Sequence, residues 1–147
     1  MKICVCGSIA FYDEMATVKL ELEQLGHEVY IPHSEFTDGT GKTMAIKDAY
    51  KFRQTATREQ AWVWKEKNDA IWEHFRKVEW ADAILVLNYE KKGVAGYVGA
   101  NTLIEMGLAM YLRKKMFLLN AVPEQSSTEE ILGMQPIVLD GDLTRIR

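Results

Sequence analysis

The chain has 147 residues, of which 48% are hydrophobic and 27% are charged, and its formal net charge at pH 7 is −3. A chain of this length is expected to form one domain over residues 1–147, with a core large enough to need no cross-links. The slight acidic excess gives no electrostatic reason to bind nucleic acid or an anionic membrane. No apolar stretch approaches the ~20 residues of a membrane span, and Gly7 interrupts the N-terminal apolar run too early for a signal peptide.

Apolar spacing and turn residues predict strands and helices in alternation. In chain order we expect a strand at Lys2–Cys6, a helix at Asp13–Leu25, a strand at Glu28–Ile31, a polar loop at Ser34–Lys42, one long or two shorter helices between about Met44 and Trp80, a strand at Ala83–Leu87, a helix at Thr102–Leu112, a strand at Lys115–Leu119 and a short strand at Pro136–Leu139. This alternation is typical of an α/β fold in which a parallel sheet carries helices on both faces. We therefore expect a doubly wound sheet of about five strands in the order 2-1-3-4-5.

The two cysteines of the chain, Cys4 and Cys6, fall on the first strand. Their side chains point to the same side, because side chains alternate along a strand. Residues two apart on a straight strand do not readily form a disulfide. We expect both cysteines to be free and buried, which favours a cytoplasmic location.

The segment Asn88–Gly107 has the layout of a small-molecule site. It follows the apolar strand Ala83–Leu87, passes through Gly93, Gly96 and Gly99, and enters a helix that carries Glu105. Glycine lets backbone approach a ligand closely, and ligands of open α/β sheets bind at the carboxyl ends of the strands. A carboxylate on an otherwise apolar helix face must be paired or face a pocket. Glu105 is therefore a candidate site residue, and the alternative is a helix carboxylate paired with Arg113, Lys114 or solvent.

The turn after the first strand is a second candidate. Gly7 and Ser8 lie where this strand ends and the first helix begins. Backbone N–H groups at such a turn, together with a helix N-terminus, favour an anion, and the Ser8 hydroxyl adds a donor. If the first and third strands are neighbours, Gly7 and Asn88 lie side by side, and Glu105 lines the same crevice.

The segment Asp38–Thr43 ends in Gly-Lys-Thr, like a phosphate-binding P-loop. That motif also needs a glycine where this chain has Phe36, and a strand before it. The residues preceding the segment follow Pro32 and do not resemble a strand. We expect a solvent-exposed loop, or a lid over a site, rather than an ATP site.

Trp62, Trp64, Trp72 and Trp80 include a spacing of eight residues twice, which puts them near one helix face. With neighbouring apolar residues they form a large apolar surface, which predicts core packing or a dimer interface. Aromatic side chains also stack on nucleic-acid bases, but the mixed charge of this helix argues against that role. We expect a homodimer or a higher homo-oligomer.

Several stretches resemble the nucleoside 2-deoxyribosyltransferase-like superfamily: GSIAFYDEM after the first strand, ADAILVLN, and GANTLIEMGLA followed by KKMFLLN. The resemblance extends from Met1 to about Asn120 and implies a flavodoxin-like, or Rossmann-like, fold. The superfamily includes deoxyribosyltransferases and nucleotide N-glycosidases, in which the glutamate of the Glu-x-Gly-x-Ala segment attacks the anomeric carbon. It implies that Glu105 is the nucleophile and that Gly7 and Ser8 bind the phosphate or sugar side of the substrate. The expected substrate-binding set is Gly7, Ser8, Ile9, Asn88, Gly99 and Asn101.

The chain departs from the superfamily at two positions. Cys4 stands where members often have a tyrosine, and His74 stands where an aspartate assists the departing base. Asp69 is a further candidate for that second role. A five-residue strand rises ~16 Å, and a helix returns that height in about eleven residues, which puts Asp69 level with the crevice and His74 lower.

These residues predict an enzyme that cleaves or transfers at the N-glycosidic bond of a nucleoside or nucleotide, with Glu105, Asp69 and His74 as candidate catalytic groups. Breaking this bond builds positive charge on the sugar, which a carboxylate stabilises or captures, and an Asp or His supplies the base with a proton. We expect no cofactor and no metal, because His27, His33 and His74 lack the spacing of metal ligands. The alternative is a nucleotide-binding or regulatory protein that kept the fold and lost the chemistry.

Overall fold

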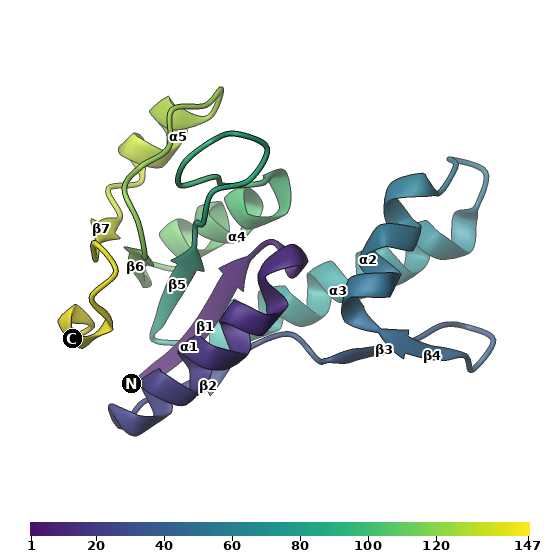
Figure 1. Cartoon of the computed structure of the whole chain (residues 1–147), viewed down its shortest axis with the longest axis horizontal. Helices are drawn as coiled ribbons and strands as arrows, with labels where there is room; N and C mark the ends of the chain where they lie inside the picture. The colour runs from purple at the N-terminus through teal and green to yellow at the C-terminus, as the bar shows by residue number, and fades with distance from the viewer.

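The computed structural model describes residues 1–147 and confirms the α/β architecture with a doubly wound parallel sheet (Figure 1). The sheet order is β2-β1-β5-β6-β7, and all four pairings are parallel. This is the predicted order 2-1-3-4-5, because the two additional strands, β3 and β4, form a separate antiparallel hairpin. The strands of the sheet are β1 (Lys2–Gly7), β2 (Glu28–Tyr30), β5 (Ala83–Leu87), β6 (Lys115–Leu118) and β7 (Ile137–Val138).

The helices follow the predicted pattern with a few differences. They are η1 (Ile9–Phe11), α1 (Tyr12–Gln24), α2 (Ile46–Thr55), α3 (Ala61–Trp80), α4 (Ala100–Tyr111), α5 (Thr128–Gly133) and η2 (Leu143–Arg145). The helical region between Met44 and Trp80 is thus two helices, one of the two expected possibilities. The elements α5, η1 and η2 were not predicted, because helices of three to six residues are too short to show an apolar period. No helix of the structure is long and apolar enough to cross a membrane.

Both faces of the sheet are covered, and the strands supply alternate residues to two separate cores. One core joins Ile3, Val5 and Leu85 to Met15 and Leu22 of α1, and it also takes in the C-terminal segment. The other core joins the opposite side of the same strands to α3, α4 and α5, and its strand residues are Cys4, Cys6, Ile84, Val86, Met116 and Leu118. Burial on both faces explains why Ala83–Leu87 is an unbroken apolar run.

The chain between β2 and α3 forms an arm to one side of the sheet, on the right in Figure 1. We call residues 34–70 the arm: it contains β3 (Glu35–Thr37), β4 (Thr43–Ala45), α2 and the first half of α3. The prediction of a polar loop at Ser34–Lys42 is therefore wrong in part. The strand in this segment, β3, has only three residues and is mostly exposed, so it shows no alternation of apolar and polar residues from which it could be predicted.

The Gly-Lys-Thr segment covers the end of the turn of this hairpin and the first residue of β4, and no helix begins there, so the rejection of a P-loop stands. Asp38 organises the turn, because its Oδ1 accepts hydrogen bonds from the backbone N–H groups of Thr40 and Lys42. The residues before the turn do form a strand, contrary to expectation, but this strand belongs to the hairpin and not to the parallel sheet.

One of the four tryptophans of α3 packs against the core, and the other three are exposed. Trp80 packs against the core beside α4, whereas Trp62, Trp64 and Trp72 are 45%, 40% and 57% exposed. Core packing, one of the two expected roles, therefore accounts for only one of them. The surface formed by the other three tryptophans is exposed in the single chain. The expected oligomer stays a prediction.

Candidate active site

A crevice opens at the carboxyl end of β1, between α3 and α4, and it has two connected parts. The first, which we call the inner pocket, includes Tyr30, Phe36, His74 and Glu105 in its wall. The second, the basic pocket, is lined by four cationic side chains, Arg53, Lys67, Lys91 and Lys92. The two parts share five lining residues, which makes them a single crevice: Gly7, Ile9, Arg53, Lys67 and Asn101.

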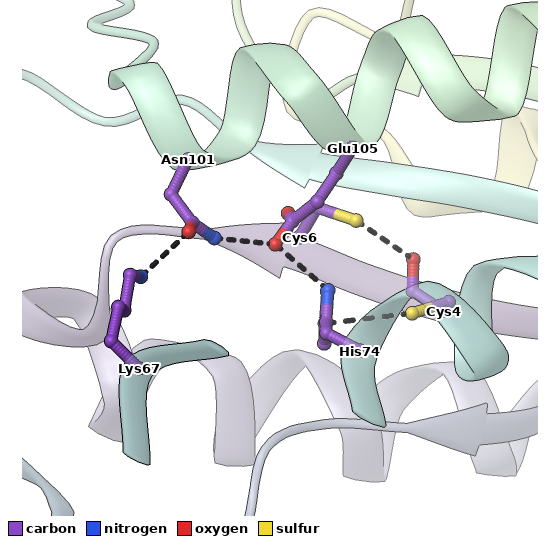
Figure 2. Close-up of polar contacts among 6 residues, drawn as sticks. All are labelled: Cys4, Cys6, Lys67, His74, Asn101 and Glu105. Atoms are coloured by element: carbon purple, nitrogen blue, oxygen red, sulfur yellow. Dashed lines mark hydrogen bonds and ion pairs between the residues drawn. The ribbon is translucent and has the colours of Figure 1, made fainter. Parts of the chain in front are cut away.

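Glu105 lies in the wall of this crevice, on the inward face of α4, and its residue surface is only 3% exposed. Its Oε1 accepts a hydrogen bond from Asn101 Nδ2 at 2.6 Å and lies 2.9 Å from His74 Nδ1 (Figure 2). Its Oε2 is buried and has no hydrogen-bond partner. The expected alternative, pairing with Arg113 or Lys114, is wrong: Lys114 donates to the carbonyl of Glu79 instead.

His74 reaches the crevice from the opposite helix, α3, and lies between Glu105 and Cys4 (Figure 2). Its Nδ1 makes the ion pair with Glu105, although the ring N–H is not aimed well enough at Oε1 to count as a hydrogen bond. Its Nε2 lies 3.6 Å from Cys4 Sγ. Burial by itself lowers the pKa of His74, but the contacts with Cys4 and Glu105 outweigh burial and raise it to about 10.

Cys4 and Cys6 lie on β1 next to His74 without lining either part of the crevice, and both are free and fully buried, as expected. Contact with Cys6 and with His74 lowers the pKa of the Cys4 thiol to about 6, against the opposing effect of burial. Contact with Cys4, together with burial, raises the pKa of Cys6. Cys4, His74 and Glu105 therefore form one charged or strongly polarised group that connects β1, α3 and α4.

The basic pocket gathers four cations, none of which lies within ion-pair distance of a carboxylate. The Nζ of Lys91 donates to Ser8 Oγ at 2.7 Å and to the Tyr50 hydroxyl at 2.9 Å. Burial lowers the pKa of both Arg53 and Lys67, and the nearby Arg53 charge lowers that of Lys67 further. The α4 N-terminus lies in the same pocket, at Gly99 and Ala100. Uncompensated cations beside a helix N-terminus favour an anionic ligand group.

Most of the predicted site residues meet in this crevice. Glu105, His74, Gly7, Ile9 and Asn101 line the inner pocket, and Ser8 and Gly99 line the basic pocket. Ser8 also begins η1, where its Oγ accepts a hydrogen bond from the N–H of Ala10. A side chain at Gly7 would be crowded, because a Cβ would lie 3.2 Å from both the Leu87 carbonyl oxygen and Met15 Cε.

Asp69 does not reach the crevice. Its side chain is 57% exposed and pairs with Lys65 at 2.8 Å. The neighbouring part of α3 does reach the crevice, and four of its residues line the inner pocket: Lys67, Ala70, Ile71 and His74. These positions follow the i, i+3, i+4, i+7 pattern of one helix face, and Asp69 points to the other side. The estimate from helix rise identified the part of α3 that reaches the crevice, but it put His74 too low and ignored the rotation of the helix.

Asn88 is buried but lines neither part of the crevice. Its side chain joins the loops after β5 and β6: Nδ2 donates to the carbonyls of Asn120 and Ala121, and Oδ1 accepts from the Asn120 N–H. Gly96 serves the same junction, because it has φ +70° and a Cβ there would lie 2.5 Å from the Ala121 carbonyl oxygen. Both residues stabilise the junction of the two loops, and neither lines the crevice.

Sequence reasoning missed the cations of the basic pocket. Lys67 could have been predicted from the sequence, since it lies seven residues before His74 and therefore on the same face of α3. Arg53 and Lys91 carried no signal, because they come from α2 and from the loop after β5 and meet only through the position of the arm.

No family model matches this chain, and the searches of curated proteins and of solved structures found no significant match. The geometry of the crevice therefore carries the functional argument.

Proposed function

We propose that this protein cleaves or transfers at the N-glycosidic bond of a nucleoside or nucleotide, with Glu105 as the nucleophile. The observation that carries the proposal is a buried carboxylate at the junction of a partly apolar pocket and a cationic pocket. This arrangement matches a substrate with a flat base on one side of the reacting carbon and an anion on the other. The resemblance to nucleoside 2-deoxyribosyltransferases and nucleotide N-glycosidases supports the same reaction.

In the proposed reaction an oxygen of the Glu105 carboxylate attacks the anomeric carbon of the sugar. The bond from that carbon to the base nitrogen breaks, its electron pair stays with the base, and the base takes up a proton. Water or a second base then attacks the same carbon and frees the carboxylate, and its proton passes to the group that protonated the departing base. The negative charge of Glu105 also stabilises the positive charge that builds on the sugar.

His74 and Asn101 are proposed to position the carboxylate. Both contact Oε1, from opposite sides, and thereby fix its rotation about the side chain (Figure 2). His74 also lies on the inner-pocket side, where the base is expected to sit, so it is the better candidate than Asp69 for giving the departing base its proton.

The four cations favour a phosphorylated substrate within this class. A phosphate on the sugar side would accept hydrogen bonds from Lys91 and Ser8, and it would relieve the mutual repulsion of Arg53 and Lys67. We therefore propose that nucleotides bind more tightly than the corresponding nucleosides.

One observation favours the alternative, a nucleotide-binding or regulatory protein without activity. Oε1 is already held by Asn101 and His74, and Oε2 faces the interior, so the carboxylate must turn or exchange partners before it attacks a substrate. In this second candidate the same crevice binds a nucleotide, and Glu105 serves only to anchor His74.

A panel experiment separates the two candidates. The purified protein is incubated with nucleosides, 5′-nucleotides, their deoxy forms and NAD, with and without an added acceptor base, and free base is measured. Glu105→Gln protein serves as the blank, because Gln keeps the side-chain volume and removes the charge. Base release by the unmodified protein alone supports the enzyme, and nucleotide binding without base release from any compound supports the regulatory protein.

A further inference from the structure

Beside the inner pocket, β1 and α3 bring together three side chains that are good ligands for a soft metal ion. The atoms Cys4 Sγ, Cys6 Sγ and one ring nitrogen of His74 all lie within 4.8 Å of one another. Cys4 and Cys6 come from β1, and His74 comes from α3, 70 residues from Cys4 along the chain (Figure 2). The expectation of no metal site rested on the spacing of histidines, and spacing does not reveal ligands that converge from separate elements.

The distances suit tetrahedral coordination. With metal–sulfur bonds of about 2.3 Å and metal–nitrogen bonds of about 2.0 Å, a tetrahedral ion holds its sulfur and nitrogen ligands about 3.5 Å apart and two sulfurs about 3.8 Å apart. Cys4 Sγ and His74 Nε2 are 3.6 Å apart, and the 4.8 Å limit leaves shifts of no more than about 1.3 Å for Cys6. The hydrogen bond that the Cys6 thiol donates to the Cys4 carbonyl is long, at 3.9 Å, and a small rotation of the side chain would break it.

The other ring nitrogen of His74 has the partner that metal-binding histidines usually have. Nδ1 lies 2.9 Å from the Glu105 carboxylate, while Nε2 lies 3.6 Å from Cys4 Sγ. A carboxylate on the distal nitrogen fixes the tautomer and the orientation of a ligating histidine. The pairing also explains the buried Glu105 and its unpartnered Oε2, because a cation a few ångströms away stabilises a carboxylate that has too few hydrogen bonds.

The charges balance and an entry route exists. Two thiolates and a neutral imidazole neutralise a divalent ion, so a buried site carries no net charge apart from Glu105. The cysteines are fully buried, but the His74 side chain is 11% exposed and lines the inner pocket, so an ion can enter past it.

We propose that Cys4, Cys6 and His74 form a site for a thiophilic metal ion of the Zn²⁺ type, with Glu105 orienting His74 and a fourth position left to water or to Glu105. Thiolate and imidazole ligands in this combination suit Zn²⁺ and Cu⁺ rather than Mg²⁺ or Ca²⁺. The site is independent of glycosidic cleavage, although a metal on Nε2 would occupy the histidine proposed to position the nucleophile.

The test uses the full chain, stripped of metal with a chelator and kept reduced with a phosphine. Co²⁺ is titrated first, because tetrahedral cobalt with thiolate ligands gives strong visible bands and a near-ultraviolet charge-transfer band. We expect one equivalent to bind with both signals, and one equivalent of Zn²⁺ to remove them. X-ray absorption of the zinc form should show two sulfur and two nitrogen or oxygen neighbours, a readout that needs no variant.

Variants then assign the ligands. Cys4→Ser and Cys6→Ser should each weaken the metal affinity by more than about 100-fold, since even a group that only hydrogen-bonds a ligand contributes 10–100-fold. Glu105→Gln should weaken it by about 10–100-fold while keeping the thiolate band. His27→Gln is the matched control, because it removes a histidine outside the cluster and should change nothing.

Cobalt bound without a charge-transfer band, or zinc with nitrogen and oxygen neighbours only, would overturn the proposal. So would an affinity that His27→Gln lowers as much as Cys4→Ser does. A failed cleavage assay would leave these metal readouts unaffected, and a failed metal titration would leave the cleavage assay standing, so the two proposals fall separately.

Discussion

The two faces of the sheet are built from the same strands but have different contents. The α1 face is lined by apolar side chains alone, including Ile3, Val5, Leu85 and Leu22. The α3–α4 face has an apolar core as well, but at its crevice end it also buries Cys4, His74 and Glu105 in contact with one another. A buried carboxylate without a full set of hydrogen bonds is unfavourable for folding, whereas apolar packing is favourable.

Under the proposed function, the α1 face would contribute mainly to stability, and the crevice end of the other face would contribute to catalysis or binding. A protein keeps buried polar groups with incomplete hydrogen bonding where function requires them. Substitutions on the two faces should therefore separate: one set should change the free energy of unfolding, and the other should change catalysis or binding.

The largest expected effect is on cleavage by Glu105→Gln. Loss of the nucleophile should lower the rate of base release by more than about 10³-fold, or more than ~4 kcal/mol, because Gln can neither attack the sugar nor stabilise its positive charge. The free energy of unfolding, from urea titration, should fall little or rise. Glu21→Gln on the exposed side of α1 is the control, and an equal loss of rate in that variant would end the assignment.

Leu22→Ala should have the opposite profile. Leu22 is fully buried between α1 and the sheet, so truncation leaves a cavity and should lower the free energy of unfolding by about 2–5 kcal/mol. Base release per folded molecule should stay close to that of the unmodified protein. If Leu22→Ala lowered this rate as strongly as Glu105→Gln, the separation of the two faces would be wrong.

Lys91→Met tests the basic pocket. Removing the cation that donates to Ser8 and Tyr50 should weaken the binding of a 5′-nucleotide by about 1.5–3 kcal/mol, roughly tenfold or more, and should leave the nucleoside unchanged. Calorimetry with a nucleotide and its nucleoside measures both values. Lys19→Met, on α1, is the charge-matched control, and an equal weakening for nucleoside and nucleotide would argue against a phosphate subsite.

The smallest effect on the fold is expected at Trp72. This side chain is 57% exposed in the single chain, so Trp72→Lys should change monomer stability by less than about 0.5 kcal/mol. The predicted homo-oligomer should nevertheless dissociate, since a charge would enter its apolar interface. Light scattering checks both statements: a mass near 16.8 kDa for the unmodified protein at micromolar concentration would reject the oligomer.

Local pattern was sufficient for the fold class and for the central site residue. The strands of the sheet are short and apolar, and their alternation with helices leaves few topologies, so the order of the sheet was predictable. Glu105 was identifiable because a single carboxylate on an apolar helix, just after a glycine-rich loop, has few structural explanations. Asn88 was predicted to bind substrate because it directly follows a buried strand. Its side chain instead joins two loops.

The sequence by itself determined which side chains share one face of one element, since strand and helix periods are local. It put Cys4 and Cys6 on one side of β1, and the same period would have put Lys67 with His74 and left Asp69 outside. Only the tertiary structure decided which elements meet. The packing of α3 and α4 over β1 brought His74 between Cys4 and Glu105, and the position of the arm gathered the cations, because contacts across such separations depend on how helices dock and not on any local spacing.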